Sequence, residues 1–187
     1  MNRQTLIGRM AALNTNNPKA VEIFICELAD EAREGPRALV DLWLNQAAGV
    51  PRKRPIILIP ELEDLAIQPL LEIPPSKLTP SDHAWLINTI ADAEVAFRNS
   101  IVVRLISLLD DKTPVPQPII PNSEGQPLPR RICDEAYMAL RQILQLGEGS
   151  HAAALNANAY LSLIESRRNE EIQKFKASKT FAAFVDE

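Results

Sequence analysis

The chain has 187 residues, of which 46% are hydrophobic and 24% are charged, a composition typical of a globular domain that builds its own core. Its net charge of −4 argues against a nucleic-acid-binding protein, because such proteins usually carry a basic excess that neutralises phosphates. No stretch approaches the roughly 18 uncharged apolar residues that a membrane span needs. We therefore expect one domain over residues 1–187, with no nucleic-acid partner and no membrane partner.

Apolar residues at helical spacing predict the elements of the first half of the chain. Helices are expected over residues 18–33, 36–48 and 61–72, and Pro69 must kink or end the last of these. Three prolines stand at the first position of a predicted helix. The residue before each proline either caps that helix or separates it from the preceding helix. These pairs are Asn17-Pro18, Gly35-Pro36 and Thr79-Pro80.

The second half of the chain is also predicted to be helical. One apolar stripe begins after the Thr79 cap and continues to Leu109, with a break near Asn99-Ser100. Further helices are expected over residues 130–146 and 151–177. Because the chain holds fifteen prolines and only six glycines, it has few positions for tight hairpin turns. The sequence therefore predicts an all-α protein with about seven or eight helices.

Two Pro-rich connections, residues 49–60 and 112–129, separate these helices. The second is long for a connection between packed helices, where roughly 2 to 8 residues are usual. Its six prolines favour an extended, polyproline-like path, and Asn122 to Gly125 supply a turn. This segment is either a binding loop that projects from the helices or an insertion that packs on their surface.

Two of the predicted helices follow one pattern. Phe97-Arg-Asn-Ser-Ile-Val-Val-Arg-Leu-Ile-Ser-Leu108 and Ile132-Cys-Asp-Glu-Ala-Tyr-Met-Ala-Leu-Arg-Gln-Ile143 each place apolar residues at their start, one turn later and at their end. They resemble the second helix of a HEAT repeat, whose pattern runs Val-Arg-x-x-Ala-Ala-x-Ala-Leu-x-x-Ile. Ala136 and Ala139 fit the small residues of that pattern, and Tyr137 departs from it.

This resemblance covers roughly residues 80–146 and implies antiparallel helical hairpins stacked as a short HEAT-like α-solenoid. Leu86 to Asp92 and Leu105 to Asp111 look like the first helix and acidic turn before each copy. Both interpretations cannot hold for simple hairpins, because residues 105–108 would then belong to two helices. An irregular helical bundle is the alternative architecture.

Residues suited to catalysis or metal binding are scarce. His83 and His151 are far apart, and neither has a second ligand at metal-binding spacing. No phosphate-binding loop, nucleophile elbow or dinucleotide fingerprint is present. Acid pairs such as Asp110-Asp111 either build a magnesium site or, more often, cap helices and solvate a surface. We expect no catalytic, cofactor-binding or metal-binding residues, and no cofactor.

Three surface features are candidate partner sites. The first is the basic segment Pro51-Arg-Lys-Arg-Pro55, which either docks an acidic partner or nucleic acid or is simply solvated. Arg130 and Arg131 precede Asp134 on one predicted helix, where an Arg131–Glu135 pair would stand at i, i+4. Phe181 and Phe184 form an apolar stripe at the end of the chain, which either folds back on the last helix or docks on another chain. The candidate partner-binding residues are Arg130, Arg131, Asp134, Phe181 and Phe184.

The cysteines and the N-terminal residues favour a cytoplasmic location. Arg9 stands where a secretory signal peptide would keep its apolar centre. Cys26 and Cys133 lie among apolar residues at helical spacing, which favours buried free thiols over a disulfide.

Together these features predict a non-enzymatic protein-binding module: an adaptor, a scaffold or an inhibitor of the immunity type. One alternative is a small helical enzyme or ligand-binding protein with a carboxylate-lined groove, in which Asp110, Asp111 or His83 would face converging partners. The other is a structural subunit that self-assembles through Phe181 and Phe184 as a homo-oligomer.

Overall fold

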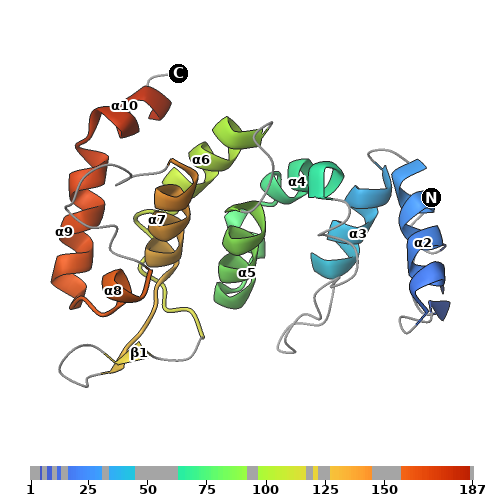
Figure 1. Ribbon diagram of the computed structural model, residues 1–187, viewed down its shortest axis with the longest axis horizontal. Helices are drawn as coiled ribbons and strands as arrows, with labels where there is room; N and C mark the ends of the chain where they lie inside the picture. Colours follow the sequence, from blue (N-terminus) through green and yellow to red (C-terminus); the bar gives the residue numbers. More distant parts are fainter. Residues whose placement is uncertain are drawn as a thin grey trace. The chain divides into compact units, whose positions relative to one another are not determined.

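A computed structural model describes most of the chain: residues 5, 8–9, 12–13, 17–30, 34–44, 63–91, 97–116, 120–121, 127–144 and 157–185. Helices dominate these residues, and two strands of two residues each accompany them (Figure 1). The prediction of an all-α protein is confirmed at this level. The chain divides into two compact units, Met1–Leu78 and Thr79–Glu187, so the prediction of one domain over residues 1–187 stays a prediction.

The first unit contains α2 (Pro18–Asp30), α3 (Glu34–Leu44), α4 (Glu63–Leu71) and a short 3-10 helix (Pro75–Lys77). Helix α3 packs against both α2 and α4. The predicted cap of α2 is confirmed, since the Ala20 N–H donates to Asn17 Oδ1 at 3.3 Å. The connection 49–60 lies outside the described residues.

Proline marks the ends of two helices in this unit. Helix α3 begins at Glu34, so Gly35 and Pro36 lie in its first turn instead of preceding it. Proline is tolerated there because its missing N–H would have no partner in the first turn of a helix. Helix α4 ends at Leu71, in the turn that contains Pro69, as the sequence predicted.

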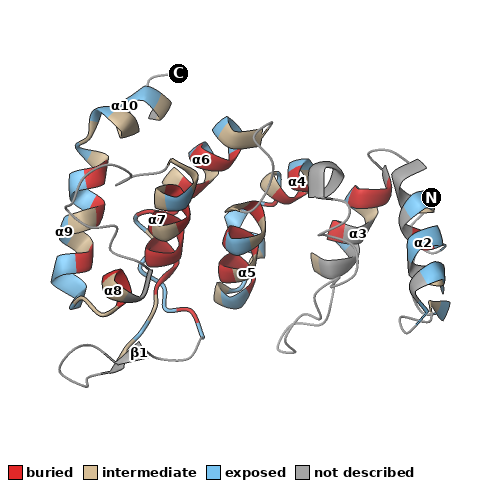
Figure 2. Ribbon diagram, viewed as in Figure 1, coloured by how far each residue is buried: buried red, intermediate tan, exposed pale blue. Residues whose placement is uncertain are grey.

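The second unit is built on α5 (Pro80–Ala91), α6 (Arg98–Ile106) and α7 (Ile132–Ile143), each of which packs against the other two. Most of α7 is buried (Figure 2). The core of the unit lies among these helices and includes fully buried side chains from each of them: Leu86, Ile87, Ile90, Val102, Leu105, Ala136 and Leu140.

The predicted break in the apolar stripe is present, but it lies before Arg98 and not at Asn99-Ser100. Helix α5 ends at Ala91 and α6 begins at Arg98, so Asn99 and Ser100 lie in the first turn of α6, where both are exposed. Their polarity marks the solvent face of a helix and not its end. Residues 105–111 form the end of α6 and a turn, so these residues are not the separate first helix that the resemblance implied before α7.

The single helix predicted over residues 151–177 was also wrong. The described residues contain α8 (Ala157–Leu161), α9 (Glu165–Lys176) and α10 (Lys179–Val185). Between α8 and α9, the Ser162 hydroxyl donates to the Ala159 carbonyl at 2.8 Å and the Leu163 N–H donates to the Tyr160 carbonyl at 3.1 Å. Such local side-chain and turn bonds compete with helix continuation.

The tail folds back within the second unit. Helix α10 contacts α6 and α9, and the ring of Phe181 meets Phe175 of α9 edge to face, with centroids 5.7 Å apart. The Ser178 hydroxyl accepts a hydrogen bond from the Phe181 N–H at 3.2 Å and caps this last helix. Of the two alternatives for the tail, the structure therefore has the fold-back.

Candidate functional site

The Pro-rich segment between α6 and α7 is an antiparallel ribbon. We call residues 111–116, 120–121 and 127–133 the ribbon, in which β1 (Ile120–Pro121) pairs with β2 (Pro127–Leu128). Three backbone bonds join its base: Val115 N–H to the Arg130 carbonyl at 2.9 Å, Ile132 N–H to Thr113 at 3.0 Å, and Cys133 N–H to Asp111 at 2.8 Å. The sequence predicted the extended backbone but not the pairing, and the predicted turn at 122–125 lies outside the described residues.

The ribbon is anchored at its base, and three of its prolines are exposed. Val115 is buried, with 5% of its surface exposed. Pro114, Pro116 and Pro129 are exposed. Figure 1 shows the ribbon extending from the N-terminal end of α7, away from the helices. The segment is thus a projection with a fixed base, as the binding-loop interpretation requires.

A buried ion network lies at this base. Asp134, in the first turn of α7, is completely buried. Arg131 binds both of its carboxylate oxygens, through Nε at 2.9 Å and Nη2 at 2.8 Å. Arg168 of α9 donates to Oδ2 at 2.6 Å, and the Tyr160 hydroxyl donates to Oδ1 at 3.0 Å. We call these four residues the Asp134 network.

Two members of the network, Arg131 and Tyr160, have shifted pKa values. Burial alone lowers the pKa of Arg131, but the hydrogen bond and negative charge of Asp134 outweigh it and raise that pKa above its ordinary value. Burial and the charge of Asp134 both raise the pKa of Tyr160, so its hydroxyl stays protonated and donates. Arg131 also donates to Glu165 and Asn169 of α9, each at 2.9 Å. The two arginines of the network therefore face two carboxylates, the buried one of Asp134 and the half-exposed one of Glu165.

One residue connects this network to the ribbon. Arg168 donates to the Pro129 carbonyl through Nη1 at 3.2 Å and Nη2 at 3.3 Å, while Nη1 also binds Asp134. The same guanidinium therefore joins α9, the first turn of α7 and the last part of the ribbon. Because Arg168 is 1% exposed, these bonds are shielded from competing water.

Arg130 forms a second ion pair beside the network. Its Nη2 donates to Glu135 Oε2 at 2.8 Å. The predicted Arg131–Glu135 pair was wrong: Arg131 turns to Asp134, and Arg130 takes Glu135 in its place. Burial raises the pKa of Glu135, and the charge of Arg130 opposes that shift.

The structure brings together three of the five predicted site residues. Arg130, Arg131 and Asp134 meet at the base of the ribbon, but burial of Arg131 and Asp134 keeps both from the reach of a partner in this conformation. Phe181 and Phe184 lie on α10, near the opposite end of α9 from Arg168, and both are half-buried. The partner-binding role of these two rings stays a prediction.

Sequence reasoning missed Tyr160 and Arg168. Arg168 stands in the charged run from Glu165 to Glu171, which favours a solvated helix face. A signal was available, because Arg168, Ile172 and Phe175 share one helical stripe and are all buried. A charged residue on the apolar stripe of a helix predicts a buried partner of opposite charge.

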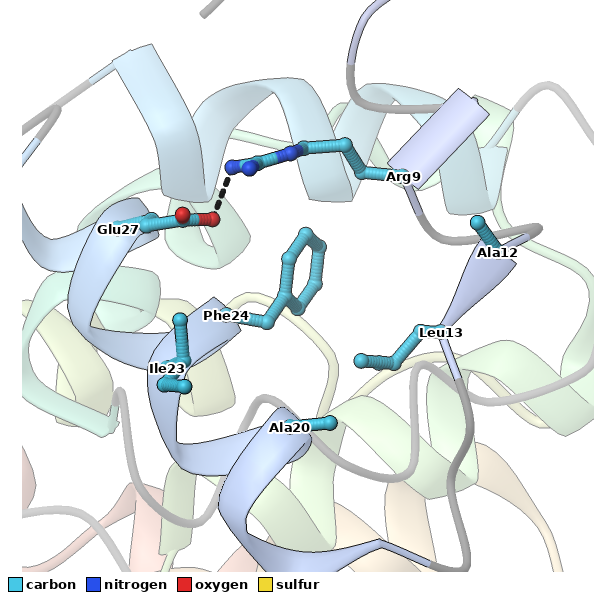
Figure 3. Close-up of a pocket in the computed structure, with 7 residues that line it drawn as sticks. All are labelled: Arg9, Ala12, Leu13, Ala20, Ile23, Phe24 and Glu27. Atoms are coloured by element: carbon cyan, nitrogen blue, oxygen red, sulfur yellow. Dashed lines mark hydrogen bonds and ion pairs between the residues drawn. The ribbon is translucent and has the colours of Figure 1, made fainter.

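The described residues of the first unit also line a hollow. It has a volume of about 330 Å³ and is lined by Arg9, Ala12, Leu13, Ala20, Ile23, Phe24 and Glu27. Figure 3 shows the Phe24 ring pointing into its centre and the Arg9–Glu27 ion pair closing one side. Among these described lining residues, Glu27 is paired with Arg9, and the other side chains are apolar.

The acids proposed for a carboxylate-lined groove have partners within the second unit. Asp110 binds Lys176 at 2.6 Å, and Asp111 Oδ1 accepts the Thr113 N–H at 2.9 Å. His83 is buried in the first turn of α5. No group of three potential metal ligands occurs in the part of the chain that the structure describes.

In the same described part, none of the helices combines the length and the apolarity needed to cross a membrane. No family of known proteins, no curated protein and no solved structure matches this chain.

Proposed function

We propose that this chain is a non-enzymatic, cytoplasmic protein-binding module in which a helical scaffold presents the ribbon to a partner. The observation that carries the proposal is the double role of Arg168, which binds the Pro129 carbonyl of the ribbon and the buried carboxylate of Asp134. A surface insertion without a role needs no such attachment to the core.

The energetics of the Asp134 network support a positioning role. Removing charges from water costs several kcal/mol per ion, and apolar replacements of buried ion pairs are often equally stable or more stable. A network of this kind is therefore a weak source of net stability. Its hydrogen bonds have direction, however, and they hold the Pro129 carbonyl and the first turn of α7 in one geometry.

A ribbon held in this way suits recognition. Ordering one backbone residue costs about 1–2 kcal/mol, so a loop that is ordered before binding loses less free energy when its partner arrives. The exposed prolines lower this cost further, because their rings fix one backbone angle. Helices α5, α6 and α7 supply the scaffold; in our proposal they stack as a HEAT-like solenoid, with an irregular bundle as the alternative.

The proposal is tested by affinity capture from the native host, at low and at high salt, with identification by mass spectrometry. The full chain is compared with a variant in which residues 116–129 are replaced by Asn-Gly, a two-residue turn that favours the hairpin geometry at the Val115–Arg130 bond. We expect a stoichiometric partner that the full chain retains at both salts and the shortened variant loses.

A matched control alters a different exposed surface. Glu170→Ala with Gln173→Ala changes the outer face of α9, which lines a shallow hollow, and leaves the ribbon intact. This control should retain the partner. Recovery of the same partner by the shortened variant, or no partner at either salt, would overturn the proposal.

A further inference from the structure

The two edges of the ribbon differ in the hydrogen-bonding groups that they leave open. Pro114 and Arg131 face each other as a non-hydrogen-bonded pair, since the bonds beside them join Thr113 to Ile132 and Val115 to Arg130. In a strand, alternate residues point their backbone groups to opposite sides. The outward groups therefore belong to Pro114 and Pro116 on one edge, and to Pro129 and Arg131 on the other.

The edge that contains Pro129 and Arg131 is closed. Proline has no N–H, and the Pro129 carbonyl accepts from Arg168. The Arg131 N–H donates to Asp134 Oδ2 at 3.1 Å, and the Arg131 carbonyl accepts the N–H groups of Asp134 and Glu135 at 3.0 and 3.2 Å. Every outward backbone group of these two residues already has a partner within the unit.

The opposite edge is open, and it can only accept hydrogen bonds. Pro114 and Pro116 are exposed and have no N–H to donate. No hydrogen bond to either of their carbonyls occurs among the described residues. An added strand needs both donors and acceptors from an edge, so proline at both outward positions blocks strand addition here.

A partner of this edge must supply hydrogen-bond donors and an apolar surface for two proline rings. Tryptophan and tyrosine side chains provide both, because each joins a flat ring to an N–H or O–H group. Aromatic-lined grooves recognise extended proline-rich segments in this manner. Lys112 adds an exposed positive charge beside the edge, which favours a groove with a nearby carboxylate.

We propose that the edge Thr113–Pro116 docks in an aromatic-lined groove of a partner protein, whose side chains donate hydrogen bonds to the carbonyls of Pro114 and Pro116. This inference rests on the proposed function and specifies the class of partner. At this edge it also opposes the other common use of a projecting ribbon, which is the addition of a strand from a second protein.

The test measures binding of the full chain to a panel of isolated aromatic-groove domains of the SH3, WW and EVH1 kinds, by surface plasmon resonance. We expect at least one domain to bind, and Pro114→Ala with Pro116→Ala to weaken that binding about tenfold or more, since central contacts of an interface dominate its affinity. Thermal unfolding of the variant checks that it remains folded, which we expect because both side chains are exposed.

The matched control is Pro74→Ala with Pro75→Ala, which removes two other exposed prolines from the first unit. It should bind as the unchanged chain does. A panel that stays unbound, or binding that both variants retain equally, would overturn the groove proposal. If the native host still yields a partner that depends on the ribbon, protein binding stands and only the partner class is wrong. If that partner binds the variant Pro114→Ala with Pro116→Ala more tightly than it binds the unchanged chain, the partner adds a strand to this edge and does not hold it in an aromatic groove.

Discussion

Two helices of the second unit, α5 and α7, begin with the same capping hydrogen bond but differ in the other bonds that the capping acid makes. In α5, Asp82 accepts the Thr79 N–H at 2.8 Å; in α7, Asp134 accepts the Arg131 N–H at 3.1 Å. Each acid stands three residues after the residue that precedes the helix, where it also faces the positive end of the helix dipole.

The start of α5 is completed locally. The Thr79 hydroxyl donates to Asp82 Oδ2 at 2.7 Å, and the Asp82 N–H donates to Thr79 Oγ1 at 3.3 Å. The start of α7 has an arginine in place of threonine, so Asp134 is bound by guanidinium groups and reaches Arg168, distant in sequence. The bonds named here for the start of α5 cap that helix, whereas those at the start of α7 also join it to α9 and the ribbon.

The largest expected effect comes from removing the carboxylate of α7. Asp134→Ala leaves Arg131 and Arg168 buried without their shared counter-ion, and breaking a buried ion network in this way costs about 3–5 kcal/mol. Urea denaturation of the full chain measures the loss. A loss no larger than that of Asp82→Ala would show that the two helix starts are equivalent.

Coupling between Asp134 and Arg168 is the next effect in size. In a double-mutant cycle with Asp134→Asn and Arg168→Met, we expect a coupling free energy of about 2 kcal/mol, because the two side chains share a buried bond of 2.6 Å. The same cycle with Asp82→Asn and Arg168→Met should give a coupling near zero. Equal coupling in the two cycles would contradict a specific contact.

A smaller loss is expected at the start of α5. Asp82→Ala removes the acceptor of the Thr79 N–H and hydroxyl, and the loss of a helix cap costs about 1 kcal/mol. Thr79→Ala should cost a similar amount, since both changes break one capping box. Urea denaturation measures both variants, and a cost near that of Asp134→Ala would mean that Asp82 also has a long-range role.

The smallest expected effect on stability at neutral pH concerns the residues that precede Asp82 and Asp134. These are Ser81 in α5, which is exposed, and Cys133 in α7, which is buried. Burial and the neighbouring charge of Asp134 raise the pKa of the Cys133 thiol from 9.0 to about 11. The folded chain thus retains this proton longer than the unfolded chain does. The resulting stabilisation is complete below pH 9 and is lost as the pH rises toward 11.

Two measurements check this prediction. Cys133→Ala should remove the part of the alkaline loss of stability that belongs to this thiol, while Ser81→Ala should leave it unchanged. Cys133 is buried as the sequence predicted, whereas the prediction of a buried thiol at Cys26 was wrong, because Cys26 is exposed. A thiol reagent at neutral pH should therefore modify Cys26 rapidly and Cys133 only on unfolding. Rapid reaction of both thiols in the folded chain would contradict the burial of α7.

The features that sequence reasoning recovered are local. The Asn17 cap, the Thr79-Pro80 start and the end of α4 near Pro69 depend on residues within one turn of each other. The extended path of the ribbon followed from its prolines for the same reason. Each of these signals depends on side chains and backbone groups that are close together in any compact conformation.

The features that it missed depend on distant contacts. In the sequence, Arg168 belongs to a charged run that predicts a solvated helix face, and only its contact with Asp134 of α7 shows that it is buried. The turn after Tyr160 depends on the hydrogen bonds of Ser162 and Leu163, which the sequence pattern does not predict. The choice of Asp134 over Glu135 as the partner of Arg131 also depends on Arg168, which shares that carboxylate. The sequence therefore pointed to Arg130, Arg131 and Asp134 at the start of α7, but not to the bonds that these residues form.

The most direct test of the account is amide hydrogen exchange at Val115, whose N–H closes the base of the ribbon on the Arg130 carbonyl at 2.9 Å. If the Asp134 network holds the ribbon, this amide is protected in the unchanged chain, and Arg168→Met removes its protection while the amides of α5 keep theirs. Free exchange at Val115 in the unchanged chain, or equal protection in Arg168→Met, would contradict the claim that the network positions the ribbon.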